Sequence, residues 1–335
     1  MNYNLFLITS PLQLINAIEA REHFKLTLNI LVVIFTEHES KNKNQISRLI
    51  NEDDWDKVIR FDQRLKNSKT TFLRQIKLVK LLQKESYNML FCGDFSSINK
   101  MIIANVHKNK VYLMDDGAVT INRHLNELGV KYSDQKIPLK KRARQWRFNL
   151  FGLKTIPTDT INMFTSYVLT AHGNEEIVRN ELKYFKKTFL AKATIDNKIY
   201  CLGQPLSEIK VITRETYLEY IGLIKNYYGT NIIYIPHRAE QAIDDILAME
   251  DENFKVMYTD LPIELEFIMT NRYPMEVCSF FSSALFTLNI IYPECNIIAF
   301  EIDREKMLSP RPAIDNVYNY ITKSTSIKKV PLNGL

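Results

Sequence analysis

Closely spaced metal ligands are missing from this sequence. Its four cysteines stand far apart in apolar runs, and no two form a CxxC pair (Cys92, Cys201, Cys278 and Cys295). No HExxH motif occurs either. Structural zinc sites use cysteine and histidine ligands at short spacings, so these absences weigh against one. We expect reduced thiols that lie in the core.

The glycine-rich loops that bind dinucleotides and ATP are also missing. The sequence contains neither a GxGxxG fingerprint nor a Walker A loop. In both motifs the glycines let the backbone approach the phosphates of the ligand closely. Their absence weighs against dinucleotide and ATP chemistry.

Long hydrophobic runs are absent as well. No apolar run reaches the roughly 18 residues that a membrane-spanning helix requires. The first residues, Met1–Ile8, lack the basic region and the small-residue cleavage site of a signal peptide, and they have the pattern of a first strand. We therefore expect a cytoplasmic protein.

Length and charge narrow the class further. The chain has 335 residues, of which 46% are hydrophobic and 24% are charged, which is typical of a globular protein of two domains. A formal net charge of +6 favours an anionic ligand or an anionic membrane surface, and it does not require nucleic acid.

Apolar runs alternate with amphipathic stretches along the chain. Runs such as Leu28–Phe35 and Val111–Met114 are separated by stretches with helical periodicity such as Thr71–Lys84. This alternation is typical of a parallel sheet with helices on both faces. The pattern also predicts a helix over Glu175–Phe185, with glutamates early and lysines late, and a polar linker over Ala193–Lys198.

The second half repeats the scheme. Strands such as Ile232–Ile235 alternate with helices such as Thr213–Tyr228, and a last helix near Ile314–Thr322 either closes this half or packs back on the first. The prediction is an α/β protein with two doubly wound domains, residues 1–192 and 193–335, and a cleft between them.

Three short polar motifs follow apolar strands. They are Asp115-Asp116-Gly117, Pro236-His237-Arg238 and Ser282-Ser283. Open α/β sheets bind ligands beyond the carboxyl ends of their strands, so these motifs mark a candidate site. A carboxylate there can accept a proton, a histidine can hydrogen-bond a leaving phosphate, and serines at a helix start can bind phosphate oxygens.

Each motif also has an ordinary structural explanation. The carboxylates can belong to a simple Asp-Gly turn, in which Gly117 permits the tight bend. His237 can be a structural histidine, although Arg238 beside it favours an anion site. Ser282 can be a helix N-cap.

Two further acidic features have the same ambiguity. Glu264 lies just inside a predicted helix, where a carboxylate suits the helix dipole and can also grip two ribose hydroxyls. Asp54 and Asp56 form a DxD pattern, which metal-dependent sugar transferases use. They lie in an acidic run between a helix and a strand, which favours a solvated segment.

A basic stretch with one tryptophan lies near the middle of the chain. Its members are Lys140, Lys141, Arg142, Arg144, Trp146 and Arg147. The stretch has three interpretations: contact with anionic lipid with the indole at the interface, an ordinary exposed face, or a grip on an acidic acceptor.

In this order and spacing, the motifs resemble those of the bacterial lipooligosaccharide and capsule sialyltransferases, over most of the chain. The segments that carry the resemblance are Thr9-Ser10-Pro11-Leu12-Gln13, Asp115-Asp116-Gly117, Leu202-Gly203-Gln204-Pro205-Leu206, Pro236-His237, Pro262-Ile263-Glu264 and Ser282-Ser283. The family usually has His-Pro, whereas this chain has His237-Arg238-Ala239-Glu240. The histidine is kept, and the fixed turn of the proline is lost.

The resemblance implies a GT-B fold, in which an acceptor-side and a CMP-sugar-binding Rossmann-like domain face each other across a cleft. It implies inverting transfer of sialic acid from CMP-sialic acid to a terminal galactose-type sugar of a lipooligosaccharide or capsule, without a cofactor or a required metal. A homodimer and peripheral contact with the cytoplasmic face of the inner membrane are further implied partners.

The resemblance also assigns roles on the catalytic side. Asp115, followed by Asp116, resembles the general base that deprotonates the acceptor hydroxyl. Glu215 lies where some relatives place the base instead. His237 resembles the acid or hydrogen-bond donor to the leaving phosphate, and Arg238 stands beside it.

On the donor side, the resemblance makes Ser282 and Ser283 ligands of the phosphate. Glu264 resembles the ribose ligand. Gly203 and Gln204 fall in the loop on the cytidine side.

Three alternatives stay open. The same fold can use another CMP-sugar, such as legionaminic acid or Kdo, or polymerise sialic acid. A non-catalytic GT-B domain can bind an acidic glycan or act as a scaffold in capsule assembly. A metal-dependent transferase can use Asp54 and Asp56.

Overall fold

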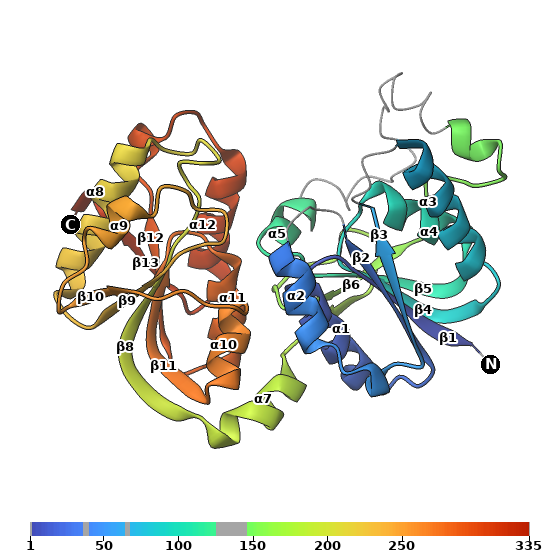
Figure 1. Cartoon of the computed structure of the whole chain (residues 1–335), viewed down its shortest axis with the longest axis horizontal. Coiled ribbons are helices and arrows are strands. Elements are labelled where there is room, and N and C mark those ends of the chain that lie inside the picture. Colours follow the sequence, from blue (N-terminus) through green and yellow to red (C-terminus); the bar gives the residue numbers. More distant parts are fainter. Residues whose placement is uncertain (1, 36–39, 64–67, 125–145, 335) are drawn as a thin grey trace. The chain divides into compact units, whose positions relative to one another are not determined.

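The computed structural model describes residues 2–35, 40–63, 68–124 and 146–334 (Figure 1). The chain forms two compact units, Met1–Tyr184 and Phe185–Leu335. Each unit is built on one parallel sheet, as the alternating pattern predicts. The first unit ends at Tyr184, ahead of the expected boundary after Lys192.

The first unit contains a seven-stranded sheet in the order β3-β2-β1-β4-β5-β6-β7, and all its neighbouring strands are parallel. Its strands are β1 (Tyr3–Ile8), β2 (Asn29–Phe35), β3 (Lys57–Asp62), β4 (Ser86–Cys92), β5 (His107–Met114), β6 (Ile161–Thr165) and β7 (Ile177–Arg179). Its helices include α1 (Pro11–His23), α2 (Ser40–Leu49), α3 (Ser68–Leu82), α4 (Ser97–Asn105) and α5 (Val119–Arg123), and α7 (Lys183–Phe189) crosses into the second unit.

The central strand β1 divides the core of this unit between two faces. Leu5 and Leu7 point to the cluster that α3 and α4 cover, whereas Phe6 and Ile8 point to the cluster that α1 covers. Successive side chains of a strand point to opposite faces, so a fully apolar strand needs helices on both sides. This burial explains why β1 shows no polar alternation.

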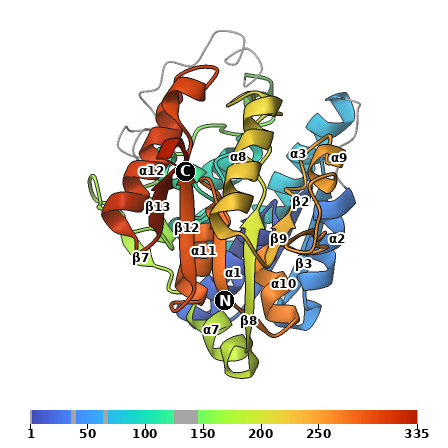
Figure 2. The same cartoon turned by 90° about the vertical axis from the view of Figure 1, so that its left-hand side faces the viewer.

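The second unit contains a six-stranded parallel sheet in the order β10-β9-β8-β11-β12-β13. In Figure 2, where this unit faces the viewer, α8 lies in front of the sheet and α10 and α11 lie behind it. The strands are β8 (Thr194–Leu202), β9 (Ile232–Ile235), β10 (Phe254–Val256), β11 (Arg272–Ser279), β12 (Asn296–Glu301) and β13 (Lys328–Pro331). The helices are α8 (Arg214–Tyr228), α9 (Asp244–Leu247), α10 (Ile263–Met269), α11 (Ser283–Ile291) and α12 (Pro312–Ser324).

Two local predictions are wrong. The predicted helix over Glu175–Phe185 is replaced by β7, which pairs with β6, and by α7, which begins only at Lys183. The predicted linker over Ala193–Lys198 is instead mostly the first half of β8, where Ile195 pairs with Tyr273 of β11. In both segments, hydrogen bonding to a distant strand outweighs the local polar character.

All four cysteines are buried, as expected. In the part of the chain that the structure describes, no helix is long and apolar enough to cross a membrane.

Candidate active site

The two adjacent aspartates after β5 lie in different environments. Asp115 is only 3% exposed, and its carboxylate accepts three hydrogen bonds from the end of β6 and the residue after it. Thr165 Oγ1 donates to Oδ1 at 2.6 Å, and the N–H and hydroxyl of Ser166 donate to Oδ2 at 2.6 and 2.8 Å. Burial still raises the pKa of Asp115, against the effect of these hydrogen bonds. Asp115 therefore joins two strand ends.

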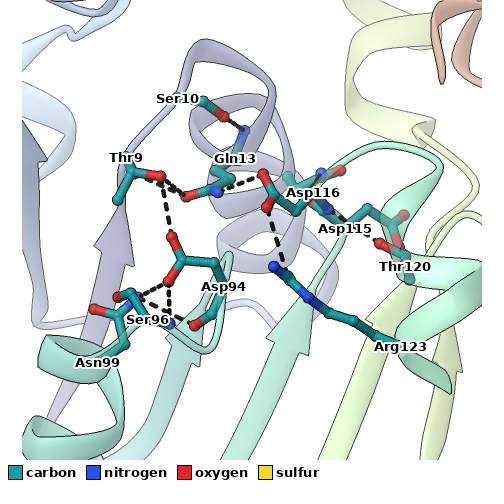
Figure 3. Close-up of polar contacts among 11 residues, drawn as sticks. Thr9, Ser10, Gln13, Asp94, Ser96, Asn99, Asp115, Asp116, Thr120 and Arg123 are labelled. Atoms are coloured by element: carbon teal, nitrogen blue, oxygen red, sulfur yellow. Dashed lines mark hydrogen bonds and ion pairs between the residues drawn. The ribbon is translucent and has the colours of Figure 1, made fainter. Parts of the chain in front are cut away.

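Asp116 is the more accessible carboxylate. Its side chain is 29% exposed. Gln13 Nε2 donates to Oδ1 at 2.7 Å, and Arg123 contacts Oδ2 at 3.5 Å (Figure 3). Partial burial, together with the nearby charge of Asp94, raises the pKa of Asp116, and the bonds from Gln13 and Arg123 oppose that rise. A raised pKa and a carboxylate oxygen that a substrate can reach are properties of a general base.

Gly117 provides the turn that presents these carboxylates. Its φ is +74°, a left-handed conformation that favours glycine. Its carbonyl accepts from the N–H of Thr120, and the hydroxyl of Thr120 contacts the N–H of Asp116 at 3.1 Å. The predicted tight turn is confirmed.

Sequence reasoning missed a polar cluster beside Asp116. Asp94 follows β4, is 9% exposed, and accepts from the N–H of Ser96 at 2.7 Å and from Asn99 Nδ2 at 2.8 Å. Its Oδ2 also accepts from the hydroxyl of Thr9 at 3.2 Å (Figure 3). The signal was present, because Asp94 follows an apolar strand in the same way as Asp115.

In the second unit, the loop after β8 is tied to two neighbouring elements. The backbone N–H of Gln204 donates to the Tyr217 hydroxyl at 3.1 Å, and its Oε1 accepts from the N–H of Phe281 at 2.8 Å. Gln204 is 8% exposed. The side chain of Gln204 therefore supports the loop that precedes α11.

Sequence reasoning gave no role to Glu240, which holds the loop after β9. Its Oε1 accepts from the hydroxyls of Tyr234 at 2.5 Å and Tyr217 at 3.0 Å, and its Oε2 accepts from the N–H of His237 at 2.5 Å. Burial raises the pKa of Glu240. Gly203 leaves room for this carboxylate, since a Cβ there would lie 2.1 Å from Oε2.

His237 lies exposed at the carboxyl end of β9, and Arg238 follows it, also exposed. Nδ1 of His237 accepts from the N–H of Ala239 at 3.1 Å. A neutral imidazole that accepts at Nδ1 carries its proton on Nε2. This tautomer makes Nε2 a hydrogen-bond donor.

The paired serines begin α11. Ser282 is its N-cap, and its hydroxyl accepts from the N–H of Ala284 at 3.3 Å; Ser283 is the first helical residue. Both are half-buried. Glu264, in the first turn of α10, is 6% exposed, and burial raises its pKa against a hydrogen bond from Thr287. The capping interpretation of Ser282 is confirmed, and a cap leaves the helix start able to bind an anion.

Glu215 is exposed in the first turn of α8. Hydrogen bonds from its own backbone N–H and from Thr213 lower its pKa. A lowered pKa makes a carboxylate a weaker base, so the environment of Glu215 is less suited to proton abstraction than that of Asp116.

The DxD pair lies at the wrong edge of the first sheet for a site with Asp116. Asp54 and Asp56 precede β3, whereas Asp116 follows β5, and the strands are parallel. Asp56 Oδ2 accepts from the N–H of Asn29 at 2.6 Å, and Asp54 pairs with Arg21 at 3.6 Å. Both carboxylates have structural partners.

Most of the basic stretch, from Lys140 to Arg144, lies outside the described residues. Trp146 is 60% exposed. The guanidinium carbon of Arg147 lies 5.2 Å from the centre of the Phe72 ring of α3. Arg147 therefore adjoins α3.

The sequence matches the family model for alpha-2,8-polysialyltransferase (POLYST) over residues 4–300. The chain belongs to this family. It is therefore a glycosyltransferase of the sialyltransferase type. A search of curated proteins finds no match to this member of the polysialyltransferase family.

Solved structures show the fold of this family member. The spinosyn rhamnosyltransferase SpnG, complexed with thymidine diphosphate, has a TM-score of 0.51 at 10% identity, over 98% of this chain and 86% of that chain. A glycosyl transferase family 9 protein from Veillonella parvula has a TM-score of 0.44 at 9% identity, over 98% and 86%. The first likeness, with the two parallel sheets, confirms the GT-B fold of two Rossmann-like domains.

Proposed function

We propose that this protein transfers sialic acid from CMP-sialic acid to a hydroxyl of the terminal sugar of a bacterial surface glycan, with inversion and without a required metal. The observation that carries the proposal is the partly exposed carboxylate of Asp116 beyond the end of β5. Membership of the polysialyltransferase family supports the class of donor.

Asp116, rather than Asp115, is the proposed general base. A base needs a carboxylate oxygen that an acceptor hydroxyl can reach, and the two oxygens of Asp115 already accept from Thr165 and Ser166. In the proposed step, the acceptor oxygen bonds to the anomeric carbon of sialic acid as its proton passes to Asp116. The bond from that carbon to the phosphate oxygen breaks, and CMP leaves with the electron pair.

The second unit supplies the proposed donor site. Nε2–H of His237 donates to the leaving phosphate, and Ser282 and Ser283 bind the phosphate at the start of α11. Arg238 adds positive charge beside it. These groups offset the charge that develops on CMP, which is the task that a metal performs in other transferases.

The nucleoside end of CMP is assigned to the neighbouring loops. Glu264 binds the ribose hydroxyls, and the Gly203–Gln204 loop lies on the cytidine side. The bonds of Gln204 to Tyr217 and Phe281 fix that loop before the ligand arrives, which lowers the entropy cost of binding.

The family match favours a particular acceptor. A polysialyltransferase extends a chain whose terminal sugar is itself a sialic acid, so we propose a sialic acid terminus ahead of the galactose terminus expected from the sequence. Asp116 can deprotonate a secondary hydroxyl of either sugar, so the base is the same in both cases.

CMP release from CMP-sialic acid, measured in excess EDTA, tests the proposal. Release that needs an α2,8-linked sialic acid oligomer would establish the polymerising activity, and release that needs lactose would establish the galactose acceptor. His237→Ala should lower the rate about 10²–10³-fold, the usual cost of losing one transition-state donor. Activity only after manganese addition would contradict the metal-free mechanism.

The remaining alternatives give different results. If another CMP-sugar competes with CMP-sialic acid and is consumed faster, that sugar nucleotide is the donor. A protein that binds an acidic glycan but releases no CMP from any CMP-sugar would be the non-catalytic scaffold.

A further inference from the structure

A buried glutamine joins the end of β1 to Asp116. Gln13, near the start of α1, has no exposed surface. Its Oε1 accepts from the N–H of Thr9 at 2.7 Å and from the hydroxyl of Thr9 at 3.1 Å, and its Nε2 donates to Asp116 Oδ1 at 2.7 Å (Figure 3). Because a backbone N–H occupies Oε1, the amide has one favourable orientation, with its NH₂ toward the carboxylate.

A glycine makes room for this amide. Gly93 directly follows β4, and a Cβ built on it would lie 2.1 Å from Cδ and 2.2 Å from Oε1 of Gln13. Gly93 is not among the residues with positive φ. Space for Gln13, rather than a left-handed backbone, therefore requires glycine at this position.

We propose that Gln13 is the positioning residue of the general base, and that Gly93 is required because the Gln13 side chain occupies its Cβ position. This inference rests on the proposed role of Asp116. The amide fixes the rotation of the carboxylate through Oδ1, so that Oδ2, which contacts Arg123 at 3.5 Å, is the oxygen directed to the acceptor.

The charges around Asp116 set the sign of the expected effect. Burial, with a smaller effect of Asp94, raises the pKa of Asp116, and the Gln13 amide and Arg123 oppose that rise. Asp115, the preceding residue, points its carboxylate to Thr165 and Ser166 instead. Removal of the Gln13 amide should therefore raise the pKa of Asp116 and move the acidic limb of the pH–rate profile to higher pH.

Gln13→Leu tests the positioning role, with Gln83→Leu as the control because Gln83 lies exposed just after α3 and its side-chain amide donates to the Asn105 carbonyl, away from Asp116. We expect kcat to fall about tenfold, KM for CMP-sialic acid to stay unchanged, and the acidic limb to move up only in Gln13→Leu. A lower melting temperature with an unmoved pH profile would mean a structural role alone and would overturn the inference.

A double-mutant cycle tests the role of Gly93. Gly93→Ala should reduce kcat as Gln13→Ala does, and adding it to Gln13→Ala should cost little more, because the clashing side chain is gone. Gly222→Ala is the control, since nothing lies within 4 Å of a Cβ there. Independent, additive losses would contradict the inference. If wild type releases no CMP, the proposed function fails, while melting temperatures still report the Gly93–Gln13 coupling.

A separate observation concerns an exposed apolar surface on the first unit. The Phe72 ring of α3 lies 4.7 Å from Phe148 and 5.6 Å from Phe151, so α3 and the segment that begins at Trp146 are side by side (Figure 1). The four large apolar side chains around this contact are 44–65% exposed (Leu73, Trp146, Leu150 and Phe151). Several exposed large apolar side chains on two adjoining segments mark a candidate interaction site.

The same surface is basic. Neither α3 nor the described segment from Trp146 to Leu153 contains an aspartate or a glutamate. Lys77 is exposed on α3 one helical turn after Leu73, and Arg147 lies over Phe72. We name the set of Leu73, Lys77, Trp146, Arg147, Leu150 and Phe151 the α3 surface.

Because the family resemblance already implies peripheral membrane contact, the inference concerns its location: we infer that the α3 surface is the part of the first unit that binds an anionic lipid bilayer. Exposed leucine and aromatic side chains enter the interface, tryptophan favours the headgroup level, and cations pair with anionic headgroups. A second copy of this chain fits less well, because a twofold interface would place the same cations opposite each other.

Vesicle co-sedimentation of the full chain tests this inference. Binding to phosphatidylglycerol vesicles, weaker with phosphatidylcholine and at high salt, is expected, with a blue shift of Trp146 fluorescence; the other tryptophan, Trp55, is buried. Trp146→Ala/Leu150→Ala should weaken binding roughly tenfold or more, because apolar area is lost. Tyr258→Ala, a 62% exposed aromatic position of the second unit, is the control. No binding, or a dimer that the double variant breaks, would overturn the inference.

Discussion

In each unit, a glycine that follows a strand leaves space for a polar side chain, and the two side chains have different roles. Gly93 follows β4 and leaves space for Gln13, whereas Gly203 follows β8 and leaves space for Glu240. In the first unit the enclosed group is a neutral amide that donates to an accessible carboxylate, Asp116. In the second unit the enclosed group is itself a carboxylate, and its oxygens accept from two tyrosine hydroxyls and a backbone N–H.

The comparison separates two carboxylates whose pKa values are both raised. Burial is the largest cause for Asp116 and for Glu240. A raised pKa alone therefore does not identify a base, because structural networks also raise it. The hydrogen-bond partners distinguish the two roles. Glu240 holds the loop of His237, whereas Oδ2 of Asp116 makes a long contact of 3.5 Å with Arg123.

The largest expected effect comes from replacing the two aspartates after β5, one at a time. Asp116→Asn should lower kcat about 10²–10⁴-fold with little change in melting temperature, because it removes the proposed base from a partly exposed position. Asp115→Asn should mainly lower the melting temperature, because it disturbs three hydrogen bonds from Thr165 at the end of β6 and from Ser166 after it. The measurements are CMP release and thermal unfolding. Asp115→Asn as the inactive, stable variant would reverse the assignment.

Glu240→Ala should have the next largest effect. It removes one acceptor of the N–H of His237 and of the hydroxyls of Tyr217 and Tyr234, which also hydrogen-bond each other at 2.8 Å. The loss costs about 1–3 kcal/mol of unfolding free energy for each group that stays buried and unpaired. Release of the His237 loop should also lower kcat. Denaturant unfolding and CMP release measure both. Glu219→Ala, an exposed site on α8, is the control, and equal effects at the two sites would remove the special role of Glu240.

Much of the fold follows from sequence because its strands are apolar on both faces. Leu28–Phe35 and Ile232–Ile235 are predicted nearly residue for residue. The segment at Ile177–Arg179 was predicted as helix because its strand partner, β6, is unknown from local pattern. The proposed choice between Asp115 and Asp116 is likewise beyond the local pattern, since it depends on Thr165 and Ser166, about fifty positions later.

Gly203→Ala should have a smaller effect than Glu240→Ala. The new methyl group would lie 2.4 Å from the Tyr234 hydroxyl and closer to Glu240, so the carboxylate or the loop must move. We expect a loss of about 1–3 kcal/mol of unfolding free energy, the usual cost of overpacking. Chemical denaturation measures it against Gly222→Ala. An unchanged stability would show that the network of Glu240 adapts, and that the two glycines are not equivalent.

Replacement of Glu264 should have the smallest effect, and it contrasts a buried carboxylate with the accessible carboxylate of Asp116. Burial raises its pKa above the ordinary value of 4.5, so the folded state favours the protonated form. The stability that this contributes is complete below pH 4.5 and is lost as pH rises through the raised pKa. Glu264→Gln lacks this loss and should be more stable than wild type at neutral pH, while its KM for CMP-sialic acid rises because a ribose ligand is weakened. Melting temperatures from pH 4 to 8 and donor titrations check both signs. A variant that is less stable than wild type at neutral pH would mean that Glu264 is a purely structural carboxylate. A variant that is more stable and has a higher KM would mean that Glu264 is kept for binding at a cost in stability.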